Sequence, residues 1–142
     1  MIIPDINLLL YAHDEAAVLH GRSARWWSAL MEDGEAIALP WAVVMAFVRM
    51  TTARAVMRAP LSTAEAIDIV ESWLEQPNVQ ILEPGPRHLA ILRQLLTAIE
   101  VGGNLTTDAH LAALAIENQG EIHSNDNDFG RFPGLRWHNP VG

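Results

Sequence analysis

Four aspartates occupy positions at which side chains from distant parts of the chain can meet. Asp5 ends an apolar run at the start of the chain, Asp108 opens a helical pattern, and Asp126 and Asp128 follow a late apolar run. In open parallel sheets, ligands collect beyond the carboxyl ends of the strands, so residues far apart in sequence converge at that edge. The sequence therefore predicts a cluster of carboxylates.

Such a cluster favours a bound divalent cation. Carboxylates held close together repel one another unless one is protonated or a cation lies between them. The chain has no cysteine, and an all-oxygen ligand set favours Mg²⁺ or Mn²⁺ over zinc. A bound ion of this kind orients a water, lowers its pKa and neutralises charge on a phosphate, which makes phosphodiester hydrolysis the predicted reaction class.

Each aspartate also has a purely structural explanation. Asp5 can cap a helix that starts near Ile6. Asp108 in a first helical turn is favoured by the helix dipole. Asp126 and Asp128 lie in a segment, residues 124–128, whose composition is typical of any turn. Taken singly these alternatives stay open, and only the combination favours a functional site.

The elements that must position these residues alternate between short apolar strands and longer helical patterns, which predicts an α/β fold with a mostly parallel central sheet flanked by helices. Ser62 and Glu65 form a capping box at the start of one helix. We predict strands at residues 1–4, 36–39, 79–82, 121–124 and 135–138. We predict helices at residues 23–31, 41–57, 62–74, 89–99 and 106–118, the last capped by Thr106 or Thr107.

Composition narrows the function further. The 142 residues are half apolar, which is enough for one domain over residues 1–142, and no apolar run is long enough to cross a membrane, so we expect a cytoplasmic protein. All nine basic residues are arginine, and the absence of lysine excludes P-loop phosphate binding and Schiff-base chemistry. A net charge of −8 argues against a broad basic face for nucleic acid.

Three segments carry a resemblance to the PIN domains of VapC-type toxins. Residues 2–12, Ile-Ile-Pro-Asp-Ile-Asn-Leu-Leu-Leu-Tyr-Ala, resemble the first motif of that family. Residues 105–115, Leu-Thr-Thr-Asp-Ala-His-Leu-Ala-Ala-Leu-Ala, are similar to its helix motif, and residues 122–132, Ile-His-Ser-Asn-Asp-Asn-Asp-Phe-Gly-Arg-Phe, resemble its closing motif. The motifs occur in the family's order, and the resemblance extends over essentially the whole chain.

The resemblance implies a three-layer PIN-like fold and a role for each matching residue. Asp5, Asp108 and Asp126 would be catalytic metal ligands for Mg²⁺ or Mn²⁺, and Asp128 would be a catalytic residue at a second or outer position. Asn7 and Ser124 would support those ligands. One departure is Ala46, in the sequence Ala46-Phe47-Val48-Arg49, where many PIN nucleases have glutamate; this makes catalysis with two metals less secure.

The resemblance implies a metal-dependent endoribonuclease that is the toxin of a type II toxin–antitoxin module. Its expected partners are an RNA substrate, a cognate antitoxin and a second copy of the chain, because homodimers are usual in such families. Ala46 motivates an alternative, a weakened PIN domain that binds RNA or antitoxin without cleavage. A receiver-type domain phosphorylated on Asp5 ranks lower, since it would need a lysine that the chain lacks.

Two further groups of residues are considered. His110 follows Asp108 by two residues and is a candidate for the rim of the site, although a structural histidine is the more common case. Arg49, Arg54 and Arg58 recur every four or five residues along one predicted helix, which begins at residue 41. They form either a narrow basic strip for a phosphate backbone or an ordinary solvated helix face.

Overall fold

The computed structural model describes residues 1–100 and 103–142. A five-stranded sheet has the order β3-β2-β1-β4-β5, and every strand runs parallel to its neighbours. The strands are β1 (Ile2–Pro4), β2 (Ile37–Pro40), β3 (Val79–Leu82), β4 (Glu121–His123) and β5 (Arg136–His138). The α-helices are α1 (Ile6–His13), α2 (His20–Asp33), α3 (Trp41–Thr51), α4 (Thr63–Leu74), α5 (His88–Ile99) and α6 (Thr106–Glu117).

The central strands are buried because the sheet is covered on both faces. Every residue of β1 and of β2 is buried, as the uninterrupted apolar runs predict for a parallel sheet between helical layers. The edge strands β3 and β5 each expose part of their length. Ile3 pairs with Ile122 of β4, so the carboxyl ends of β1 and β4 lie side by side at one edge of the sheet.

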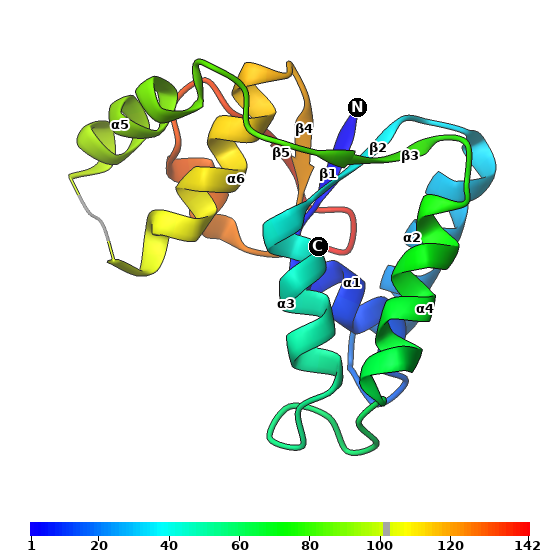
Figure 1. Ribbon diagram of the computed structural model, residues 1–142. Coiled ribbons are helices and arrows are strands. Elements are labelled where there is room, and N and C mark those ends of the chain that lie inside the picture. The colour runs from blue at the N-terminus through cyan, green and yellow to red at the C-terminus, as the bar shows by residue number, and fades with distance from the viewer. Residues whose placement is uncertain (101–102) are drawn as a thin grey trace.

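The chain direction decides which face each helix covers. The path from β1 to β2 to β3 moves one way across the sheet, and the path from β3 to β4 returns past β1. Because crossovers between parallel strands are right-handed, the reversal moves the connecting helices to the opposite face. Figure 1 shows α5 and α6 on one side of the sheet and α1 to α4 on the other. The predicted three-layer α/β fold is confirmed.

The buried apolar side chains form one continuous cluster that joins the sheet to helices on both faces. Ile3 in the sheet, Phe47 of α3 and Leu114 of α6 are each fully buried within it. In the part of the chain that the structure describes, no helix is long and apolar enough to span a bilayer.

The predicted helix at residues 41–57 is too long. Helix α3 ends at Thr51, where the hydroxyl of Thr51 donates to the Phe47 carbonyl at 2.7 Å and that of Thr52 to the Val48 carbonyl at 2.8 Å. These hydroxyls compete with the backbone donors that would continue the helix. Met57 is buried in the connection that follows, so its apolar character reflects loop packing rather than a helix stripe.

The predicted cap of α6 is also wrong. A 3₁₀ turn, η1 (Gly103–Leu105), leads directly into the helix, and Thr106 is already the first helical residue. Leu105 occupies the cap position, and no side-chain hydrogen bond is made there. The capping box at Ser62, by contrast, is present as predicted, with Ser62 and Glu65 bonded reciprocally at the start of α4.

Candidate active site

The four aspartates lie at the sheet edge where the strand order reverses. Asp5 directly follows β1, and its backbone N–H donates to the carbonyl of His123, the last residue of β4, at 2.9 Å. Asp108 is in the first turn of α6, the helix that precedes β4. Asp126 and Asp128 belong to the turn after β4, which includes the 3₁₀ helix η2 (Asn127–Arg131). This edge is the place where open α/β sheets bind ligands.

Three of the carboxylates form a tight group. Oxygen atoms of Asp108, Asp126 and Asp128 all lie within 4.8 Å of one another, and each residue is half-buried. The Asp126 carboxylate also accepts the Asp128 N–H at 2.9 Å, which fixes the turn so that both carboxylates stay near α6. Asp126 thus stabilises the turn and also contributes a carboxylate to the group.

Asp5 lies near this group but is not one of its three members. Its side chain is 6% exposed, and its carboxylate accepts two hydrogen bonds, from the Ile6 N–H at 2.8 Å and from the Ser124 hydroxyl at 2.7 Å. The first bond caps α1, so the structural explanation of Asp5 holds. The negative charge of Asp5 nevertheless acts on Asp108 and is acted on by Asp126, so the residue also belongs to the electrostatics of the site.

Ser124 connects the buried carboxylate to the cluster. The Ser124 side chain is fully buried, and its hydroxyl, which donates to Asp5, accepts from Asn7 Nδ2 at 3.2 Å and from the Asp126 N–H at 2.9 Å. Asn7 also accepts the N–H of Asn125 through its Oδ1 at 3.4 Å. Asn7 and Ser124 therefore contact the aspartates or the turn that carries them.

The carboxylates carry perturbed pKa values. Burial, followed by the negative charges of Asp5, Asp126 and Asp128, raises the pKa of Asp108 to about 6. Burial also raises the pKa of Asp5, while the hydrogen bonds from Ser124 and Ile6 oppose that rise. The site therefore holds more negative charge near neutral pH than its surroundings stabilise.

The raised pKa of Asp108 predicts a pH-dependent stability. A carboxyl whose folded-state pKa lies above its unfolded value near 4 stabilises the fold while protonated, so this contribution disappears as pH rises from about 4 to about 6. Two pKa units correspond to at most about 3 kcal/mol, and partial solvent exposure reduces this to about 1 kcal/mol. With EDTA present, we expect Asp108→Asn to unfold at a higher temperature than the wild type at pH 7.5 and at nearly the same temperature at pH 4.5. A difference in unfolding temperature between the two proteins that does not change with pH would contradict the assignment of this effect to the Asp108 charge.

The donor set fits a hard divalent cation. The group offers carboxylate oxygens only, which Mg²⁺ and Mn²⁺ prefer. Among the described residues the one ion pair to this group joins Arg131 and Asp128 at 3.9 Å, between side chains that are each 48% exposed. A single solvated arginine leaves most of the charge of the cluster uncompensated.

Sequence reasoning missed a set of supports from the end of the chain. The Trp137 indole donates to the Ser124 carbonyl at 3.1 Å, and Asn139 Nδ2 donates to Asn125 Oδ1 at 3.0 Å. Asn125 in turn donates its N–H to Asn7, so one residue of β5 and one just after it hold the turn that carries Asp126. An asparagine before a proline near a chain end reads as a turn, and nothing in the sequence signals this contact.

His110 turns toward a neighbouring helix. Its Nδ1 lies 2.8 Å from Nε2 of His88, the first residue of α5, and the rings pack edge to face. Burial, and then the His88 ring, lower the pKa of His110. The carboxylate group described above does not include this histidine. The contact joins α5 to α6.

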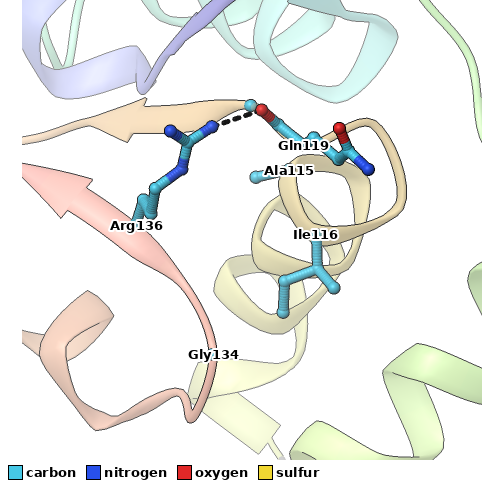
Figure 2. A pocket seen from close by; sticks show the side chains of 6 residues that line it. Ala115, Ile116, Gln119, Gly134 and Arg136 are labelled. Atoms are coloured by element: carbon cyan, nitrogen blue, oxygen red, sulfur yellow. Dashed lines mark hydrogen bonds between the residues drawn. The ribbon is translucent and has the colours of Figure 1, made fainter.

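A separate cavity lies at the opposite edge of the sheet (Figure 2). Its volume is about 420 Å³, and its walls include Gly120, directly before β4, and Arg136, the first residue of β5. Arg136 donates to the Gln119 carbonyl, as the dashed line in Figure 2 marks. The cavity lies beyond the amino ends of the strands and has no carboxylate in its walls, so it is not part of the site.

The sequence matches known proteins over nearly its full length. The sequence model of the PIN domain family matches residues 2–135. Ribonuclease VapC33 of Mycobacterium tuberculosis is 47% identical over 141 residues, which cover 99% of each chain. Ribonuclease VapC37 of the same species is 41% identical over 140 residues, covering 99% of this chain and 97% of that protein.

The fold matches solved structures at lower sequence identity. VapBC-1 from nontypeable Haemophilus influenzae has a chain that superposes with a TM-score of 0.72 at 14% identity and covers 100% of both chains. VapBC2 from Rickettsia felis, bound to a DNA fragment from its promoter, gives a TM-score of 0.71 at 18% identity over 98% of both chains. At these identities the likeness concerns the fold alone.

Proposed function

This chain belongs to the PIN domain family, and we propose on that premise that it is a divalent-metal-dependent endoribonuclease and the toxin of a type II toxin–antitoxin pair. The relatives that share up to 47% of its sequence are named ribonucleases. The observation that carries the proposal is the group of three carboxylates whose oxygens lie within 4.8 Å of one another, with the buried Asp5 nearby. Residues 1–142 form one PIN domain in this proposal.

The residues of the chain have distinct parts in this activity. Asp108, Asp126 and Asp128 would hold Mg²⁺ or Mn²⁺ together with Asp5, whose negative charge acts on Asp108. Such a cation supplies charge neutralisation at the scissile phosphate and lowers the pKa of a water. Ser124 and Asn7 hold the carboxylates in place, and the residues after β5 hold the turn. The substrate is RNA in single-stranded or loop form, whose backbone is accessible to such a site.

The partners follow from the same premise. The related solved structures are VapBC complexes, and we propose that a small antitoxin also binds this chain. We further propose a homodimer, because homodimers are usual in such families. The proposed substrate is a cytoplasmic molecule, and the proposed location of the protein is the cytoplasm.

A second candidate function is a PIN domain that binds RNA or antitoxin without cleavage. The observation that favours it is Ala46, half-buried on α3, whose methyl group offers no ligand atom where many relatives in this family have a carboxylate. The group of Asp108, Asp126 and Asp128 does not depend on that position, and this supports the cleaving form.

RNA cleavage in the presence of Mn²⁺ separates the two functions. We expect the wild-type protein to cut single-stranded RNA and to lose that activity when EDTA is added. Asp126→Asn removes a charge from the cluster and serves as the inactive reference. Wild-type cleavage that does not exceed that of Asp126→Asn would favour the non-cleaving alternative and overturn the enzyme assignment.

A further inference from the structure

The positive charge of this acidic protein is concentrated in one part of the chain. Residues 36–64 contain three arginines and no aspartate or glutamate, so this stretch carries a charge of +3. The remaining residues carry −11, which gives the chain its net charge of −8. The three are Arg49, near the end of α3, and Arg54 and Arg58, in the connection between α3 and α4. Because α3 ends at Thr51, they line the end of a helix and the loop after it rather than one helix face.

These three side chains are free to bind a ligand. Each is exposed, and none makes a hydrogen bond or ion pair with another residue in the described parts of the chain. Other arginines are already engaged: Arg22 donates to the Val141 carbonyl, Arg87 to that of Glu117, Arg136 to that of Gln119, and Arg131 pairs with Asp128. Exposed arginines without a partner can bind anions, above all phosphates.

The position of α3 connects these arginines to the acidic site. Strands β1 and β2 are parallel neighbours, so α3, which starts directly after β2, begins at the same sheet edge as Asp5. Helix α3 packs against α1 and runs away from the strands, toward the loop at the bottom of Figure 1. Arg49 is eight residues from the start of α3, which places it about 12 Å along the helix axis.

We propose that Arg49, Arg54 and Arg58 bind the phosphate backbone of single-stranded RNA that extends from the acidic site along α3. This inference rests on the proposed function, and it identifies residues that bind the substrate away from the scissile bond. A net-acidic protein repels a polyanion, so attraction at a few uncompensated arginines sets the path of the strand. Arg58 contributes least, because Asp14 and Glu15 line the same cavity as Arg58.

The test measures equilibrium binding of a fluorescein-labelled single-stranded RNA by anisotropy, in an Asp108→Asn background that prevents cleavage. We expect R49A/R54A/R58A to bind about tenfold or more weakly at low salt. Each single-strand phosphate contact contributes about 0.7 to the slope of log affinity against log salt, so the slope should fall in magnitude by about 1.4 to 2 between about 50 and 200 mM KCl. The lysine variant R49K/R54K/R58K should keep most of the RNA affinity and most of the salt dependence, because phosphate neutralisation requires only the charge.

Arg93→Ala is the matched control. Arg93 is an exposed arginine of α5 with no polar partner among the described residues, so its loss changes net charge without touching the proposed surface. A triple variant indistinguishable from Arg93→Ala in affinity and slope would overturn the proposal, as would a parent protein that binds no RNA. Loss of binding to a copurified protein partner with RNA binding unchanged would assign the surface to that partner and also overturn it.

A second substrate separates this proposal from the proposed enzyme activity. Bis(p-nitrophenyl) phosphate is too small to reach from the acidic site to Arg49, so its Mn²⁺-dependent hydrolysis reports on the aspartates alone. We expect R49A/R54A/R58A, with Asp108 intact, to hydrolyse it at the wild-type rate while losing RNA cleavage mainly through KM. Absence of hydrolysis by the wild type would count against the enzyme assignment, whereas the RNA affinities would still decide the binding surface.

Discussion

Asp108→Asn is expected to lower Mn²⁺-dependent RNA cleavage by at least about 10²-fold while making the metal-free protein more stable at neutral pH. Asp108 is one of the three carboxylates within 4.8 Å of one another, and an amide cannot replace its charge toward a cation. The same charge is repelled by Asp5, Asp126 and Asp128, which contribute to the raised pKa of Asp108. Removing this charge therefore relieves an electrostatic repulsion among the site carboxylates, and the stability of the fold increases.

The opposite signs of the two effects make this prediction specific. A variant that merely disrupts folding would lose activity and stability together. Cleavage rates and thermal unfolding in EDTA, measured on the same preparation, check both effects. Asp68→Asn is a suitable control, because Asp68 is an exposed aspartate of α4 outside the cluster. Unchanged activity in Asp108→Asn, or lower stability than the wild type at pH 7.5, would contradict the account of this residue.

Ser124→Ala is expected to destabilise the fold and to weaken metal binding. Its fully buried hydroxyl bonds to Asp5, Asn7 and the Asp126 backbone at once, so its loss leaves one oxygen of the buried Asp5 carboxylate and the Asp126 N–H without these partners. Each unsatisfied buried group costs about 1–3 kcal/mol, and we expect about 3 kcal/mol of lost unfolding free energy in total. Loss of a group that holds the proposed metal ligands in place should also weaken Mn²⁺ binding about 10- to 100-fold.

The chain provides a matched control for this substitution. Ser23 of α2 is also fully buried, but its hydroxyl has no hydrogen-bond partner among the described residues. Ser23→Ala should leave stability unchanged or raise it slightly, because it removes an unpaired polar group. Denaturant unfolding and calorimetric Mn²⁺ titration of both variants provide the comparison. Equal losses in the two alanine variants would mean that burial of a serine, and not the bonds made by Ser124, determines the effect.

The sequence predicts the sheet and the location of the aspartates well, because both follow from local patterns. Short apolar runs mark buried parallel strands, and a polar residue directly after such a run lies at the edge where ligands bind. Asp5, Asp126 and Asp128 are found there for this reason. Their convergence with Asp108 depends on the right-handed crossover between parallel strands, which is a general property of such sheets and needs no knowledge of individual contacts.

What the sequence did not predict depends on side-chain bonds at the end of one helix and on contacts between distant residues. Helix α3 ends where two threonine hydroxyls bond back to the helix, and the helix propensity of residues 52–57 does not predict this end. The bond that holds the Asp5 carboxylate comes from Ser124, 119 positions away. The reach of Asn139 to Asn125 likewise exists only once β4 and β5 are paired.

The central claim is that Asp108, Asp126 and Asp128 together bind a divalent cation, and anomalous diffraction from crystals soaked in MnCl₂ tests it directly. We predict an anomalous peak within ligand distance of carboxylate oxygens from all three residues, lost in crystals of Asp108→Asn. A site without a peak at saturating Mn²⁺, or a peak that persists unchanged in the asparagine variant, would contradict the claim.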